Sequence, residues 1–91
     1  MRSFGKNRLD RSGLKQGYWE YYYSNGNLWF KGLYKNGRLN GYWEYYYSCG
    51  NLMIKGVYLN DLRDGIWEFY DEDGSLNHKR LFENGVLIEE L

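Results

Sequence analysis

A motif that recurs at constant spacing constrains the fold more than any other feature of the chain. Residues 17–28 read GYWEYYYSNGNL, residues 41–52 read GYWEYYYSCGNL and residues 65–76 read GIWEFYDEDGSL, so each copy begins 24 residues after the last. A fixed period of this length indicates an array in which each repeat buries its apolar face against its neighbours. We therefore expect one domain over residues 1–91. It comprises a partial repeat 1–16, full repeats 17–40, 41–64 and 65–88, and a C-terminal strand over 86–91.

Each repeat is expected to form two short β-strands. In the first repeat these are residues 18–23, which are rich in aromatic side chains, and residues 28–34. Asn-Gly pairs follow them at 25–26 and 36–37, and another lies at 84–85. Asn-Gly between β-prone residues is typical of a type I′ hairpin, since both central residues need positive φ. The predicted fold class is all-β, with tandem β-hairpins forming an open, twisted antiparallel meander sheet.

Charge pairing favours one hairpin register. A two-residue turn at 25–26 would set Glu20 opposite Lys31 and Trp19 opposite Gly32. The same spacing sets Trp43 opposite Gly56, Glu44 opposite Lys55 and Glu68 opposite Lys79. Trp67 occupies the position in the third repeat that Trp19 and Trp43 occupy in the first two. Opposite charges across strands contribute roughly 0.2–1 kcal/mol each, and an aromatic ring over glycine covers exposed backbone. We prefer this register. A three-residue loop with glycine in a bulge is the alternative, and it would set Glu20 against Phe30.

On the two-residue register the strands present two different faces. The face expected to be packed carries Trp19, Tyr21, Tyr23, Leu28, Phe30 and Tyr34, with Trp43, Tyr45, Tyr47, Leu52, Ile54 and Tyr58 one repeat later. The opposite face carries the Glu–Lys pairs among aromatic side chains. Exposed aromatic patches usually mark interfaces. The candidate contacts for a partner on this second face are Tyr18, Tyr22, Trp29, Tyr42, Tyr46 and Met53.

The charge balance argues against nucleic acid and membranes as partners. Twelve basic side chains balance twelve acidic ones, although 21% of the residues are aromatic. Aromatic rings can stack on single-stranded nucleic acid, but that mode also needs a basic track, as does attraction to anionic lipid head groups. Here a glutamate is expected to oppose each lysine of the sheet. Neither partner is therefore expected.

No catalytic or metal-binding pattern stands out in the sequence. His78 is the single histidine, and no motif supplies the serine and carboxylate of a triad. Cys49 is the single cysteine and has no neighbouring histidine or cysteine to complete a metal site. We expect no enzyme activity, no cofactor and no metal. The lone cysteine and the lack of an apolar signal or membrane-spanning segment predict a cytoplasmic protein.

The repeat pattern resembles the MORN repeat, and it is similar to the bacterial variant in YwqK-like antitoxin-family proteins. The matching positions are Gly17, Trp19, Tyr22, Tyr23, Gly26, Leu28, Gly32, Tyr34 and Gly37, then Gly41, Trp43, Tyr46, Tyr47, Gly50, Leu52, Gly56 and Tyr58. Asp61 and Arg80 depart from it, because both stand where the pattern has glycine. The resemblance implies an open antiparallel sheet that binds proteins, sometimes self-associates and, by proposal, contacts lipid head groups.

These observations lead to a hypothesis and an alternative. The hypothesis is a protein-binding module, an inhibitor or antitoxin-type protein of a bacterium or phage that occludes a partner enzyme such as a toxin or nuclease. The antitoxin part is what the resemblance implies. The alternative is a structural scaffold that self-associates, because strands near Phe4 and Val86 would leave unpaired edges. Opposite charges at the two ends would suit such pairing: Arg2, Lys6 and Arg8 against Glu89 and Glu90.

Overall fold

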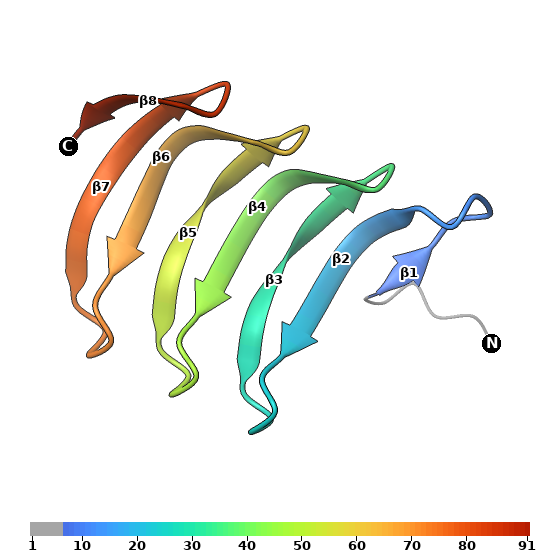
Figure 1. Cartoon of the computed structure of the whole chain (residues 1–91), viewed down its shortest axis with the longest axis horizontal. Helices are drawn as coiled ribbons and strands as arrows, with labels where there is room; N and C mark the ends of the chain where they lie inside the picture. The colour runs from blue at the N-terminus through green and yellow to red at the C-terminus, as the bar shows by residue number, and fades with distance from the viewer. Residues whose placement is uncertain (1–6) are drawn as a thin grey trace.

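The computed structural model describes residues 7–91, which form one antiparallel sheet of eight strands (Figure 1). The strands are β1 (Arg8–Leu9), β2 (Lys15–Tyr22), β3 (Leu28–Lys35), β4 (Arg38–Tyr46), β5 (Leu52–Leu59), β6 (Leu62–Tyr70), β7 (Leu76–Glu83) and β8 (Val86–Glu90). Each strand pairs with the next along the chain, so the topology is a meander with β1 and β8 at its two edges. The prediction of an all-β array of hairpins is confirmed.

The terminal strands agree in part with expectation. Phe4, near which a strand was expected, lies outside the described residues, and β1 covers Arg8–Leu9. The strand expected over 86–91 is present as β8, whose described residues are all exposed.

The turns between β3 and β4, β5 and β6, and β7 and β8 have the predicted two-residue geometry. Asn36 and Gly37 take φ values of 52° and 78°, and Lys35 pairs with Arg38 across the turn. Asp61 stands where the repeat has glycine, yet its φ of 73° is also positive. Aspartate tolerates this conformation better than most residues, and the Asp61 carboxylate accepts a hydrogen bond of 2.8 Å from the Leu39 N–H on β4. The aspartate therefore gains an inter-repeat bond that glycine could not make.

The turns within the hairpins β2–β3, β4–β5 and β6–β7 are one residue longer than predicted. At 25–26 the Gly26 N–H donates to the Tyr23 carbonyl over 3.0 Å, and the Tyr23 N–H donates to the Asn27 carbonyl over 2.8 Å. The loop therefore has three residues, 24–26, with Gly26 at φ 92°. The two-residue turn preferred for this loop was wrong. The same pattern joins Tyr47 to Asn51 and Asp71 to Ser75 in the later repeats.

A β-bulge restores the predicted strand register beyond this loop. Tyr22 opposes Leu28, but Tyr21 opposes Phe30, so Trp29 is the extra residue of β3. The loop shifts the register by one residue and the bulge shifts it back, which is why Glu20 still opposes Lys31. The face assignments of Leu28 and Trp29 are corrected as a result, as are those of Leu52 and Met53 one repeat later. Leu28 shares the side of Tyr22, and the Trp29 ring turns to the other side, 4.9 Å from the Phe30 ring.

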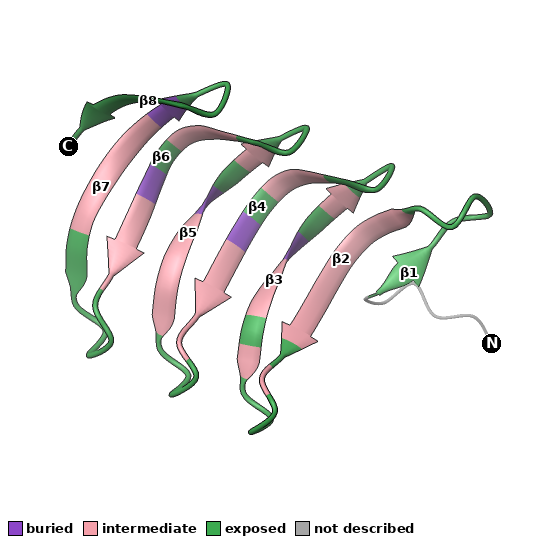
Figure 2. Cartoon of the chain, viewed as in Figure 1, coloured by how far each residue is buried: buried purple, intermediate pink, exposed green. Residues whose placement is uncertain are grey.

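The core lies on one side of the sheet, which we call the tryptophan face. Its residues are Trp19, Tyr21, Phe30, Tyr34, Trp43, Tyr45, Ile54, Tyr58, Trp67, Phe69, His78 and Phe82. Trp43 and Trp67 have no exposed surface, whereas Trp19 at the start of the array is half-buried (Figure 2). The indole N–H of Trp43 donates to the Leu33 carbonyl over 2.9 Å, and that of Trp67 donates to the Val57 carbonyl over 3.1 Å. A single-layer sheet thus buries two large side chains completely.

Each buried tryptophan lies on a glycine of the preceding hairpin. A Cβ atom at Gly32 would fall 2.1 Å from Trp43 Cδ2, and one at Gly56 would fall 2.2 Å from Trp67 Cδ2. The predicted oppositions of Trp19 to Gly32 and Trp43 to Gly56 are confirmed. However, the ring that covers each glycine comes from the next repeat, and Trp43 also opposes Gly32 across β3 and β4. The contact therefore joins hairpins to one another.

The same contact explains why the third repeat has Arg80 in place of glycine. Arg80 opposes Trp67, but the position one repeat beyond Trp67 is Leu91 at the end of the chain. No tryptophan covers this position, so a side chain fits. The Arg80 guanidinium lies 5.1 Å from the Phe69 ring centre, and its Nε lies 2.9 Å from Glu90 Oε2 on β8.

Cations cover the aromatic rings of the tryptophan face in the first and last repeats. Lys15 Nζ lies 5.0 Å from the ring centre of Tyr34 and 5.3 Å from that of Trp19. The Arg63 guanidinium lies 4.8 Å from Trp67 and 5.2 Å from Phe82. Such contacts contribute about 0.5–1 kcal/mol each at exposed sites. They also leave fewer ring surfaces free on this face for a partner.

We predict that Gly56→Ala destabilises the protein far more than Arg80→Ala does, although the two positions are equivalent in the repeat. The new Cβ would overlap the Trp67 ring, and overpacking typically costs roughly 1–3 kcal/mol or more. The denaturation midpoint of each purified variant measures the difference. An unchanged midpoint for Gly56→Ala would refute the stacking as a main source of stability.

Candidate protein-binding face

The side of the sheet opposite the tryptophans carries a row of alternating charges. Its members lie one per strand from β2 to β7, in the order Glu20, Lys31, Glu44, Lys55, Glu68 and Lys79. The predicted oppositions of Glu20 to Lys31, Glu44 to Lys55 and Glu68 to Lys79 are confirmed as strand register. We call this side the glutamate–tyrosine face. It also includes Tyr18, Tyr22, Leu33, Tyr42, Tyr46, Val57, Ile66, Tyr70 and Leu81.

Ion pairs along this row join successive hairpins. Lys31 Nζ lies 3.4 Å from a carboxylate oxygen of Glu44, and Lys55 Nζ lies 3.3 Å from one of Glu68. Lys79 completes the row with an oxygen of Glu68 at 3.6 Å. These pairs are partly exposed, so each contributes no more than about 1 kcal/mol. Their effect is to fix the carboxylates in place.

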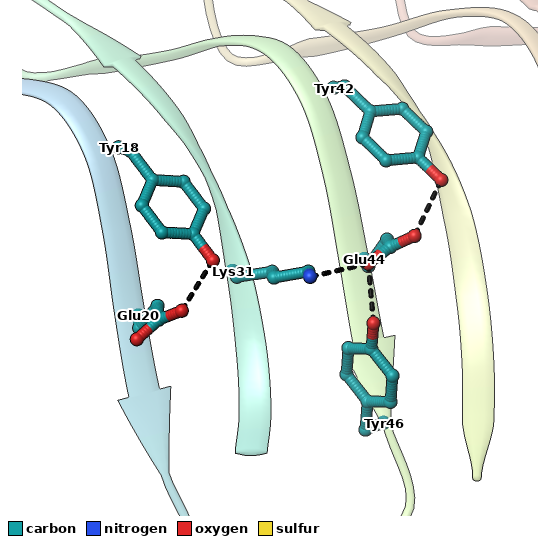
Figure 3. A network of polar contacts seen from close by, with 6 residues as sticks. All are labelled: Tyr18, Glu20, Lys31, Tyr42, Glu44 and Tyr46. Atoms are coloured by element: carbon teal, nitrogen blue, oxygen red, sulfur yellow. Dashed lines mark hydrogen bonds and ion pairs between the residues drawn. The ribbon is translucent and has the colours of Figure 1, made fainter. Parts of the chain in front are cut away.

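The carboxylates in turn hold the tyrosine hydroxyl groups. Glu44 accepts hydrogen bonds from Tyr42 at 2.7 Å and from Tyr46 at 2.5 Å (Figure 3). Tyr18 and Tyr22 donate in the same way to Glu20. The third repeat keeps half of this arrangement. Its Tyr70 donates to Glu68 over 2.6 Å, while Ile66 stands at the position equivalent to Tyr18 and Tyr42.

The protonation states match this arrangement. Burial and the hydrogen bond to Glu44 raise the pKa of both Tyr42 and Tyr46, so both hydroxyls remain donors. Burial alone would raise the pKa of Glu44, but the bonds from Tyr46 and Tyr42 and the charge of Lys31 outweigh it and lower that pKa. At neutral pH the site is therefore a carboxylate with two phenol donors, and the rings are held in fixed positions.

The tyrosine rings remain available for contact. Tyr22 and Tyr42 are 48% and 44% exposed, and Tyr18 and Tyr46 are half-buried. Exposed aliphatic side chains lie among them on the same face: Leu33, Val57 and Ile66. The sequence prediction did not include these three as contacts, although their alternation with buried residues was a usable signal. Rigid aromatic rings beside small apolar groups are typical of interface anchors.

The structure brings together four of the six predicted contact residues and separates the other two. Tyr18, Tyr22, Tyr42 and Tyr46 share the glutamate–tyrosine face through the two carboxylates. Trp29 and Met53 are the bulged residues of β3 and β5, where they lie beside the three-residue turns. Placing them on the glutamate–tyrosine face was wrong, because strict alternation fails at a bulge.

Residues that could perform chemistry are scattered. From residue 7 onward, no three His, Cys, Asp or Glu side chains gather where they could hold a metal ion. His78 Nδ1 lies 2.7 Å from Asn77 Oδ1, and Cys49 lies exposed in a turn. Over the same residues no helix is long and apolar enough to cross a membrane.

We predict that Glu44 and the tyrosines bonded to it make the protein less stable as the pH falls. The pKa of Glu44 is lower in the folded than in the unfolded chain, so its contribution is complete above the unfolded pKa of about 4.5 and is lost as pH falls through the folded value. Glu44→Gln should therefore reduce the loss of stability between pH 7 and pH 3, measured by denaturant unfolding at each pH. Glu72→Gln in an exposed turn is the control. An equal pH dependence for Glu44→Gln and the parent would contradict the assignment.

At alkaline pH, the dependence of stability on pH is expected to come from the tyrosines. Because the pKa values of Tyr42 and Tyr46 are raised above 10.0, the value of a free tyrosine, their contribution to stability is complete below that pH and is lost as pH rises above it. We expect Tyr42→Phe with Tyr46→Phe to make the unfolding midpoint less sensitive between pH 9 and pH 11. Unaltered sensitivity in the double variant would show that other groups cause the alkaline loss.

Comparison with known protein families divides the chain into the same hairpins as the structure does. The family described as MORN repeat variant matches residues 15–36, 39–60 and 63–84. These three matches coincide with the hairpins β2–β3, β4–β5 and β6–β7. No curated protein matches the chain. Since the matches cover most of its length, the chain belongs to the MORN repeat family in its variant form.

Proposed function

We propose that this protein is a non-enzymatic binding module that holds a partner protein against its glutamate–tyrosine face. MORN repeats are modules that bind proteins or membranes. The observation that carries the proposal is the pair of tyrosines tied to each of Glu20 and Glu44. Rings held in this way lose little conformational entropy when a partner covers them, which favours affinity.

The charges of this face favour a protein partner over a membrane or a nucleic acid. Glutamates alternate with lysines along the entire row, so a polyanion laid across it would meet a negative charge beside every positive one. Both kinds of polyanion need a continuous basic surface. A protein surface can instead place its own charges in the complementary alternating order.

The finer proposal is an inhibitor or antitoxin-type protein that occludes a partner enzyme, such as a toxin or nuclease, in the bacterial or phage-infected cytoplasm. It rests on the resemblance of the repeat to YwqK-like antitoxin-family proteins. The dimensions of the sheet are compatible with it. With principal extents of 45 × 33 × 17 Å, one face has room for the ~800 Å² that each partner buries in a standard interface.

The test compares capture of the partner by matched variants. Tyr22→Ala with Tyr42→Ala should weaken capture from host lysate by at least about tenfold, since two exposed aromatic anchors are lost. Val86→Ala with Ile88→Ala alters two side chains that are more exposed than these tyrosines but lie on β8, and should leave capture unchanged. Equal capture by both double variants would contradict the proposal. Stoichiometric inhibition of the captured enzyme by the purified protein would then establish the inhibitor role.

Self-association is the second candidate, and one observation favours it. The edge strand β8 exposes Val86, Leu87 and Ile88, and no described strand pairs with its outer side. An uncovered apolar edge is a template for pairing with another chain. If the chain self-associates there, Ile88→Lys should convert multimers to monomers in light scattering. A concentration-independent monomer for the parent protein would remove this candidate.

A further inference from the structure

A polar pocket of about 320 Å³ lies beside the β3–β4 and β5–β6 turns, which are neighbours at one end of the sheet (Figure 1). Its lining residues are Lys35, Asn36, Arg38, Asn40 and Asn60. The lining thus combines two cations with asparagine amides and contains no carboxylate. Ammonium, guanidinium and amide N–H groups all donate hydrogen bonds, so this composition suits an anionic ligand group.

The two cations of the pocket are not neutralised within the chain. Lys35 and Arg38 oppose each other across the turn, and neither forms an ion pair among residues 7–91. Asp61 in the neighbouring turn accepts a hydrogen bond from the Leu39 N–H and does not line the pocket. The other lysines and arginines from residue 31 onward all contact a carboxylate or an aromatic ring: Lys31, Lys55, Arg63, Lys79 and Arg80.

Hydrogen bonds within the chain fix two of the amides as donors. Asn40 Oδ1 accepts a 3.1 Å bond from the Asn60 N–H, and Asn36 Oδ1 accepts a 2.8 Å bond from Gln16 Nε2. Both side-chain oxygens are therefore occupied, and each NH₂ group remains available to donate. Charge and hydrogen-bonding capacity thus require the same kind of ligand, a negatively charged acceptor.

The next repeat shows that the fold does not require these donors. The positions of Lys35, Arg38 and Asn40 are taken there by two leucines and an aspartate, at Leu59, Leu62 and Asp64. The turn nevertheless keeps its geometry, with the two leucines opposed across it and positive φ values at residues 60 and 61. The cations are therefore available for a role other than forming the turn.

Alternation along the strands places the cations of the pocket on the glutamate–tyrosine face. Tyr34 and Leu39 oppose each other, and Tyr34 packs against the buried indole of the tryptophan face. Lys35 and Arg38 form the next opposed pair, so their side chains lie on the other side of the sheet. Tyr42 lies on the same strand as Arg38. The pocket therefore adjoins the surface assigned to the partner.

We propose that this pocket binds the carboxylate of an aspartate or glutamate side chain of the bound protein. The inference rests on the proposed function, because it names one anchor of the same partner. Lys35 and Arg38 supply the opposite charge, and the two fixed amides donate to the carboxylate oxygens. Leu59 and Leu62, which are exposed in the neighbouring turn, suit apolar side chains next to the acidic one.

The test titrates the isolated, isotope-labelled protein with N-acetyl-L-aspartate N-methylamide at constant ionic strength and follows its side-chain N–H signals by NMR. We expect saturable shifts of the Asn36 and Asn40 NH₂ groups and of Arg38 Nε–H, with a dissociation constant of about 10 mM, as suits a single exposed carboxylate. The uncharged asparagine analogue should cause no such shifts. Inorganic phosphate is titrated in parallel, because it could use the same donors.

The variants copy residues that the repeat already uses. Lys35→Leu with Arg38→Leu reproduces the next turn and should weaken binding by at least about tenfold. Asn40→Asp keeps an acceptor for the Asn60 N–H but adds a carboxylate to the pocket, so it should have the same effect. Arg8→Leu with Arg11→Leu removes equal charge outside the pocket and should leave binding unchanged.

Several outcomes would overturn the inference. These are shifts that do not saturate, shifts that the asparagine analogue reproduces, or equal binding by Lys35→Leu with Arg38→Leu and the parent. Phosphate binding at least tenfold tighter than the carboxylate would identify a phosphate site instead.

The titration needs no partner, so it separates this inference from the proposed function. Capture that is weakened by Tyr22→Ala with Tyr42→Ala but unaffected by Lys35→Leu with Arg38→Leu would refute the carboxylate pocket alone. A normal titration combined with capture that ignores those tyrosines would refute the proposed face instead.

Discussion

The stacking of a tryptophan on a glycine of the preceding hairpin is the contact on which the structure depends. A single-layer sheet has no second layer to cover its apolar side, and two-stranded hairpins are at best marginally stable alone. Trp43 on Gly32 and Trp67 on Gly56 solve this problem, because each ring is fully buried by the backbone beneath it and by its neighbours in the sheet. The hairpins are thus stable as an array, as expected for a repeat protein.

The two faces divide the requirements of folding and binding. On one side, aromatic rings pack on backbone and are covered by Lys15 and Arg63 at the two ends. On the other, Glu44 and Glu68 each bind lysine and tyrosine groups at the same time. A ring can therefore be both exposed and immobile on that side. Under the proposed function, this combination would let residues such as Tyr42 contact a partner without being needed for the core.

The fold could be predicted from the sequence, because the 24-residue period indicates a repeat array and the Asn-Gly pairs indicate hairpin turns. The register was predictable from the opposed charges of Glu20 and Lys31. The loop at 24–26 was not, since its one-residue shift is cancelled by the bulge at Trp29. The three-residue loop was the alternative, but it was expected to shift the distant pairs, and the bulge leaves those pairs unchanged. The misplaced contacts, Trp29 and Met53, are the residues at that bulge, whereas the four tyrosines were placed correctly.

The turns that lead out of each hairpin also bond back to the first strand of that hairpin. The Gly37 N–H donates to the Lys15 carbonyl, Asp61 to Leu39 and Gly85 to Arg63, all at 2.8–3.0 Å. Together with the tryptophan stacking, this makes the junctions between consecutive units chemically alike. Loss of residues 41–64 would bring Trp67 onto Gly32 and Glu68 beside Lys31 with no new kind of contact. A chain with such junctions can gain or lose a whole repeat without a mismatched contact, and its glutamate–tyrosine face then becomes one repeat longer or shorter.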